Sequence, residues 1–76
     1  MEKDFNKESK LFIKRLMLEN ELSFVELNKK LSENGFDYSD AAVRQKITRG
    51  RFDFAFVLQI CEVLDIKLTT EAKKVI

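Results

Sequence analysis

Residues 41–52 hold the charge pattern of most chemical interest in this sequence. Arg44, Lys46, Arg49 and Arg51 lie there without one acidic neighbour, although the whole chain has a formal net charge of only +1. Residues 1–40 contain seven basic and nine acidic groups, whereas residues 41–76 contain seven basic and four acidic groups. The chain therefore has a positive end, and this asymmetry favours an anionic partner.

We expect residues 40–49 to form a helix that separates an apolar side from a polar side. At 100° per residue, Val43 and Ile47 lie one turn apart and mark the buried side. Arg44 and Lys46 flank that side, one on each shoulder. The opposite side, called the outer face below, carries Ala41, Ala42, Gln45, Thr48 and Arg49.

An outer face of this kind suits the major groove of double-stranded DNA. Gln pairs with the N6 and N7 edge of adenine, Arg pairs with O6 and N7 of guanine, and alanines allow close approach. Cations beside the face meet phosphates, whose contacts supply most of the salt-sensitive affinity. We predict base contacts from Gln45, Thr48, Arg49, Ala41 and Ala42, and phosphate contacts from Arg44, Lys46, Arg51, Ser23 and Tyr38. A solvated surface helix has the same pattern, so the neighbouring elements decide between the two interpretations.

Those neighbours have the start and stop signals of helices. Periodic apolar residues predict a first helix over about 6–21, with Phe12, Ile13, Leu16 and Met17 inward, Leu11 and Leu18 widening the stripe, and Phe5 beneath it. Ser23 and Glu26 form a capping box, and we expect a second helix to end near Gly35 with Val25, Leu27 and Leu31 inward. Ser39 and Gly50 bound the third helix. Asp53 caps a fourth helix over about 54–65, and Thr69 or Thr70 weakly indicates a fifth.

Composition predicts a single all-α domain over residues 1–76, with a core of about 10–66 and a tail of 67–76. The sequence is 45% hydrophobic, with seven Phe, no Pro and only two Gly, which is too few turn residues for a strand-rich domain of this size. It has no His and one Cys, and it lacks a Gly-rich phosphate loop. We therefore expect no enzyme activity, metal, cofactor or small-molecule substrate. The absence of an apolar targeting or spanning run, together with the lone Cys61, favours a cytoplasmic location without a membrane partner.

The fourth helix is apolar around most of its circumference, and two interpretations stay open. It is either central to the core, or part of it forms a homodimer face together with Val75 and Ile76. A symmetric dimer would set two recognition helices about 34 Å apart. A rival function is a protein-interaction module without DNA binding, in which Phe36, Tyr38 and Phe52 act as exposed anchors for a protein partner. These aromatic residues equally suit packing under the turns.

The stretches LSFVELNKKL, SDAAVRQKITRG and FAFVLQICEVLDI together resemble the lambda-repressor-like (Xre/Cro-type) helix-turn-helix family over about residues 10–66. Arg-x-Lys-Ile-x-Arg-Gly-x-Phe at residues 44–52 is also similar to an uncharacterised group of short bacterial domains. The first resemblance implies four or five helices and a sequence-selective, DNA-binding transcriptional regulator of bacterial or phage type. This chain departs from that family at Phe24, where a phosphate-binding Gln is usual, at Asn28, where a small residue is usual, and in the longer turn at 32–38.

Overall fold

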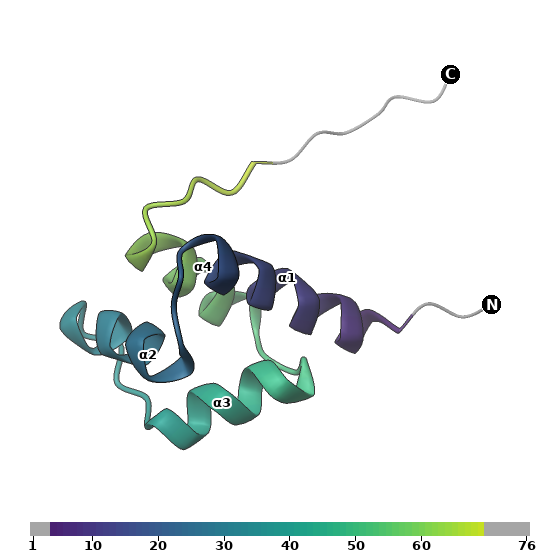
Figure 1. Cartoon of the computed structure of the whole chain (residues 1–76), viewed down its shortest axis with the longest axis horizontal. Helices are drawn as coiled ribbons and strands as arrows, with labels where there is room; N and C mark the ends of the chain where they lie inside the picture. The colour runs from purple at the N-terminus through teal and green to yellow at the C-terminus, as the bar shows by residue number, and fades with distance from the viewer. Residues whose placement is uncertain (1–3, 70–76) are drawn as a thin grey trace.

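The computed structural model describes residues 4–69, which form an all-α domain of four helices without strands in that range. Helix α1 spans Phe5–Glu19, α2 spans Phe24–Glu33, α3 spans Asp40–Arg49 and α4 spans Phe54–Val63 (Figure 1). The predicted all-α class is confirmed, and the bounds of α3 agree with the sequence analysis. Capping side chains account for the starts of the helices.

Each helix begins at a side chain that accepts backbone hydrogen bonds from the first turn. The Ser23 hydroxyl accepts from the Glu26 amide while the Glu26 carboxylate accepts from the Ser23 amide, so the predicted capping box is present. Ser39 caps α3 and Asp53 caps α4, as expected. Asp4, which the sequence analysis did not single out, caps α1.

Left-handed residues end all four helices, and two of them are not glycine. Gly35 and Gly50 have φ of +85° and +66°, as the sequence analysis implied, but Glu21 and Asp65 also have φ of +53° and +56°. The amides of Leu22 and Ile66 then donate to the carbonyls of Met17 and Cys61 in Schellman-type turns. For this reason α1 and α4 end two residues earlier than predicted, at Glu19 and Val63.

Helix α3 packs against both α1 and α2, and α2 also packs against α4, while α1 and α3 lie side by side in Figure 1. Their shared core is aliphatic around one central aromatic ring, that of Phe56. Burial also raises the pKa of the Cys61 thiol, which lies at the edge of this core. The core residues are Ile13, Leu16, Met17, Leu27, Leu31, Val43, Ile47, Phe56 and Ile60.

Several apolar residues that we expected inside lie at the surface. Phe5, Leu11, Phe12 and Leu18 are exposed on α1, and Val25 is exposed on α2. The buried stripe of α1 is narrower than its apolar stripe because only one side of this helix meets the rest of the domain. On α2 the polar Asn28 is buried in place of Val25, for a reason that the site below makes clear.

The tail prediction is tested only in part. Residues 66–69 are not helical, whereas the rest of the weakly indicated fifth helix, together with Val75 and Ile76, lies outside the described residues. Among residues 4–69, no helix has the length and apolar character needed to cross a bilayer.

Candidate nucleic-acid interface

The outer face of α3 points away from the core. Val43 and Ile47 are fully buried, while Gln45, Thr48 and Arg49 are exposed, as is Ala41. Ala42 is half-buried. The predicted division of this helix into buried and outer sides is therefore present, and the outer face begins with two small side chains, as the groove hypothesis requires.

Two cations flank this face, and aromatic rings hold both of them. The Arg44 guanidinium carbon lies 5.3 Å from the centre of the Phe24 ring, at the start of α2. On the other shoulder, the Lys46 ammonium lies 5.6 Å from the ring centres of both Tyr38 and Phe56. Such cation–π contacts restrict long side chains without neutralising their charge. Phe24, at the amino end of α2, thus holds the Arg44 side chain.

A shallow hollow of about 300 Å³ joins the outer face of α3 to Arg51, the last of the four basic residues in residues 41–52. Arg51 lies beyond the end of α3, yet it lines this hollow together with Gln45 and Arg49. Ala42 and Lys46 complete its wall. Residues predicted to contact bases and residues predicted to contact phosphates therefore share one concave surface.

A buried amide fixes the amino end of α3. The Asn28 side-chain nitrogen donates to the Asp40 carboxylate at 2.7 Å and to the Tyr38 backbone carbonyl at 3.0 Å. Both acceptors belong to the start of α3 or to the turn before it, so the amide must present its nitrogen in this direction. The Asn28 oxygen has no hydrogen-bond partner among the described residues. Asn28 thus ties the connection between α2 and α3 to α2. That connection spans residues 34–39, and not 32–38 as predicted, because α2 continues to Glu33.

We expect Asn28→Asp to destabilise the domain by about 3 kcal/mol at pH 7, because it places a carboxylate oxygen against two acceptors. Asn28→Ala removes the two bonds without adding a charge and should cost about 1–2 kcal/mol. Urea unfolding followed by circular dichroism measures both. The excess cost of Asn28→Asp should shrink as the pH falls toward about 4, because the two acceptors raise the pKa of the new carboxyl in the folded state and it protonates before the unfolded chain does. Equal costs for the two variants at pH 7 would contradict the assigned geometry.

A close backbone contact fixes the carboxyl end of α3. Gly50 is buried and left-handed, and a Cβ atom placed on it would lie 1.9 Å from the Asn6 carbonyl oxygen in the first turn of α1. Only glycine allows this approach. The outer face is therefore held at both ends, by α2 through Asn28 and by α1 through Gly50.

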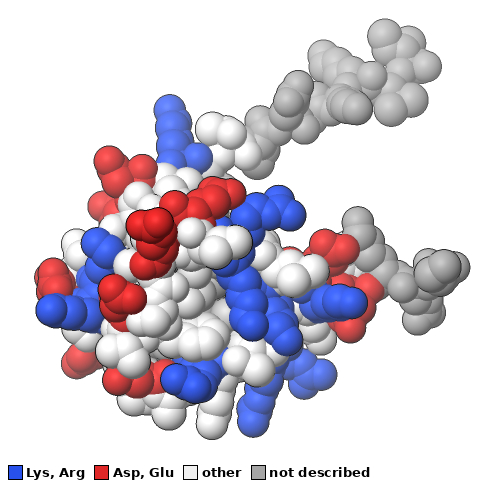
Figure 2. All heavy atoms as spheres, in the orientation of Figure 1, with Lys and Arg blue, Asp and Glu red and all other residues white. Residues whose placement is uncertain are grey.

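The contact with α1 brings in three cations that the sequence analysis missed, Lys7, Lys10 and Lys14, called the lysine row below. Lys7 and Lys10 line a hollow with Thr48 and Arg49, and Lys14 lines another with Arg44. Their spacing of three and four residues places them on one side of α1. That spacing is visible in the sequence, but residues 1–40 carry more acidic than basic groups, so their net charge did not point to a basic side on this helix. In Figure 2, Lys and Arg atoms gather at the lower right, over α1 and α3.

A protein-family model matches residues 5–69, a range that includes all four helices and the Arg44–Phe52 motif. The chain belongs to the DUF6471 family. The description of this family is a domain of unknown function, so membership assigns no activity. No curated protein and no solved structure matches the chain.

Two predicted phosphate contacts of this DUF6471 domain have other bonds in the structure. The Tyr38 hydroxyl donates to the Gln59 side-chain oxygen at 2.6 Å, and its ring packs edge-on against Phe56. The hydroxyl hydrogen is therefore engaged within the domain, and we assign Tyr38 a packing role. Ser23 is exposed, but its hydroxyl accepts from Glu26, whose pKa is lowered by the hydrogen bond from the Ser23 backbone amide. A carboxylate thus already occupies the amino end of α2, and an anion there would meet its charge.

The aromatic residues considered as anchors for a protein partner lie against the core of the DUF6471 domain. Phe36, Tyr38 and Phe52 are all half-buried and pack on the core cluster. The Phe52 ring centre lies 5.5 Å from that of Phe56. These contacts favour the packing interpretation of the three rings over the anchor interpretation.

Proposed function

We propose that this protein is a sequence-selective, double-stranded DNA-binding regulator of the lambda-repressor-like type. Helices α2 and α3 act as its helix-turn-helix unit, and α3 enters the major groove. The outer face of α3 carries the proposal, because Gln45 and Arg49 are exposed there between cations on both shoulders. We further propose that the protein works as a homodimer, so that two α3 helices bind two half-sites.

Side chains on this surface divide into two roles. Gln45, Thr48 and Arg49 reach base edges, and Ala41 and Ala42 keep the helix close to the groove. Arg44, Lys46 and Arg51 bind phosphates on either side. The lysine row extends the phosphate contacts onto α1, beyond the end of α3 where Thr48 and Arg49 meet Lys7 and Lys10. Ser23 is left out of the phosphate contacts, because both its backbone amide and its side chain are engaged with Glu26 in the capping box.

The outer-face geometry supports DNA more than a solvated surface. A merely solvated helix needs neither fixed ends nor restrained cations, whereas here Asn28 and Gly50 fix α3 and aromatic rings hold Arg44 and Lys46. Such restraint lowers the entropy that binding must otherwise remove from long side chains. Arg44 and Lys46 are thus partly ordered before they bind the phosphates of a duplex.

The salt dependence of DNA binding tests this proposal. A duplex is first selected from a random pool, where a palindromic motif would indicate twofold symmetry, and its affinity is then measured by fluorescence anisotropy across salt concentrations. Six phosphate contacts, from Arg44, Lys46, Arg51 and the lysine row, predict that log K falls with a slope of about −5.4 per subunit against log salt. Failure to select any sequence, together with binding that ignores salt, would reject the proposal.

Removing the lysine row should make DNA affinity less dependent on salt concentration. The triple variant K7A/K10A/K14A should have a slope of about −2.7 per subunit and weaker binding to every duplex, because phosphates are the same in all sequences. A matched control, K29A/K30A/K67A, removes three exposed lysines that do not line these hollows. The control should keep the slope near about −5.4. Equal slopes for the two triple variants would place the lysine row outside the interface.

A further inference from the structure

The exposed side of α1 is apolar where a solvated helix would be polar. Phe5 and Leu18 are 70% and 79% exposed, and Leu11 and Phe12 are 45% and 40% exposed. Glu8 and Arg15 are the charged residues that lie between them on this side. We call these six residues the α1 outer stripe. Four large exposed hydrophobic side chains on one helix indicate a surface that is covered by a partner.

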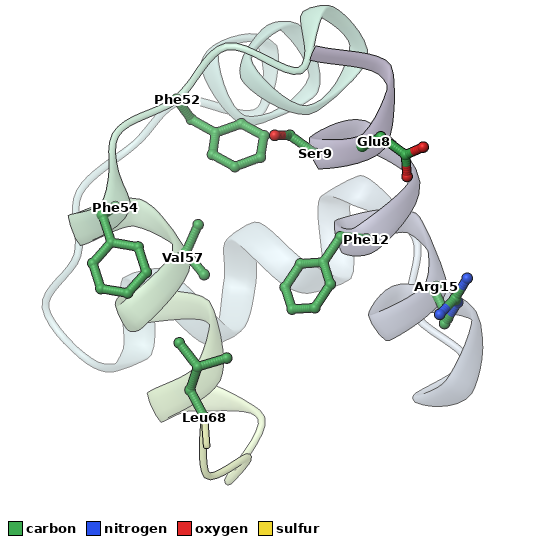
Figure 3. Close-up of a pocket in the computed structure, with 8 residues that line it drawn as sticks. All are labelled: Glu8, Ser9, Phe12, Arg15, Phe52, Phe54, Val57 and Leu68. Carbon is green, nitrogen blue, oxygen red and sulfur yellow. The ribbon is translucent and has the colours of Figure 1, made fainter. Parts of the chain in front are cut away.

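The stripe continues into an open groove beside α4. Phe12 points into this groove, which has a volume of about 460 Å³, and Val57 and Leu68 point into it from the opposite wall (Figure 3). Glu8 and Arg15 lie on its α1 edge. Phe54 and Leu58 add exposed apolar area on α4, at 62% and 47%. The apolar surface therefore extends over two helices.

The order of residues in the stripe identifies its partner. Phe5 and Leu18, Glu8 and Arg15, and Leu11 and Phe12 are three pairs that share one midpoint, between residues 11 and 12. An antiparallel copy of α1, related by a twofold axis at that midpoint, brings the two members of each pair to the same level along the helix axis. Glu8 and Arg15 lie close to one line along the helix, since seven residues make nearly two full turns, whereas Phe5 and Leu18 lie on opposite edges of the stripe. Apolar residues then share a level with apolar residues in two pairs, and the Glu8 carboxylate faces the Arg15 guanidinium of the other copy in the third. This self-complementarity is what an isologous interface requires.

We propose that the α1 outer stripe and the adjoining α1–α4 groove form the interface with a second copy of this chain. Leu11 and Phe12 lie at the twofold axis, and two reciprocal Glu8–Arg15 ion pairs lie about 5 Å along α1 on either side of it. Asp4 and Glu19 share the same midpoint, but the Asp4 carboxylate is turned to cap α1, where it accepts from the amides of Asn6 and Lys7. The inference rests on the homodimer in the proposed function, and not on DNA binding.

The α1 outer stripe and the lysine row lie on adjoining sides of α1. The lysine row lies on the side of α1 next to α3, because Lys7 and Lys10 share a hollow with Thr48 and Arg49. Glu8, Phe12 and Arg15 lie toward the groove with α4. The carboxyl end of the stripe borders the lysine row, because Leu18 lines the same hollow as Lys14 and Arg44. A dimer formed through the stripe therefore leaves Lys7, Lys10 and the outer face of α3 free.

Charge reversal tests the reciprocal ion pairs. Sedimentation equilibrium of the full chain without DNA gives the dimer dissociation constant. Glu8→Arg or Arg15→Glu alone places like charges in both pairs and should weaken the dimer about 30-fold. The double variant E8R/R15E exchanges the charges and should restore the constant to within about threefold of the original. Glu33→Arg makes the same change of charge as Glu8→Arg, but at an exposed position at the end of α2, and it should leave the dimer dissociation constant unchanged.

The apolar centre is tested with Leu11→Asp, which should give a monomer at all accessible concentrations while its helical circular-dichroism spectrum persists, because Leu11 is already exposed. A parent chain that stays monomeric overturns the inference. A dimer that E8R/R15E fails to restore overturns it as well, since the partner surface is then elsewhere. These measurements contain no DNA, so their failure is distinct from a failure of salt-dependent DNA binding.

Discussion

Gly50→Ala is expected to destabilise the domain by about 4 kcal/mol, enough to unfold much of a protein of this size. A left-handed backbone costs a residue with a Cβ atom about 1 kcal/mol or more. Here the added methyl group would also lie 1.9 Å from the Asn6 carbonyl oxygen, which belongs to the α1 backbone. Relief requires α1 to move away from α3, and this opens the core around Ile13 and Ile47.

Gly35→Ala is the matched control for that result. Gly35 also has a positive φ, of +85°, but nothing lies within 4 Å of the position that its Cβ would take. It should therefore lose only about 1 kcal/mol, for the backbone conformation alone. Thermal and urea unfolding followed by circular dichroism measure both variants. Equal losses for Gly35→Ala and Gly50→Ala would show that α1 does not press against the end of α3.

The double variant R44A/R49A is expected to weaken DNA binding by about 100-fold or more while the helical spectrum persists. Arg44 lies on one shoulder of α3 as a phosphate contact, and Arg49 lies on the outer face as a base contact. Both side chains are exposed, so neither substitution opens the core. Fluorescence anisotropy with the selected duplex measures the loss. Unchanged affinity would reject the α3 surface as the binding site.

Single variants separate the two roles. Arg49→Lys keeps the charge but loses the two-pronged contact with guanine, so it should reduce the preference for the selected sequence more than the affinity for random DNA. Arg44→Ala should weaken binding to both duplexes by the same factor. K29A/K30A, which removes two cations from α2, serves as the control and should change neither quantity. An equal loss of affinity for the selected sequence and for random DNA with Arg49→Lys would reassign Arg49 from a base contact to a phosphate contact.

Local chemistry explains why the helix starts were predictable from sequence. Ser23 with Glu26, Ser39 and Asp53 each satisfy amides within three residues, so no distant contact is needed to place these caps. The division of α3 was predictable for a similar reason, because Val43 and Ile47 are its only large apolar residues. The left-handed ends at Glu21 and Asp65 were not, since these residue types rarely adopt that conformation and the turn geometry imposes it.

Sequence alone thus determined that this is an all-α chain whose third helix has a small, polar and cationic outer side. Only the tertiary structure decided which helix lies beside it. Packing of α1 against α3 brought Lys7 and Lys10 next to Arg49, required glycine at position 50, and left Phe5 and Leu18 outside. The physical reason is that periodicity reports how apolar a face is, whereas burial depends on which faces the packed helices cover, and four short helices cannot cover every apolar stripe.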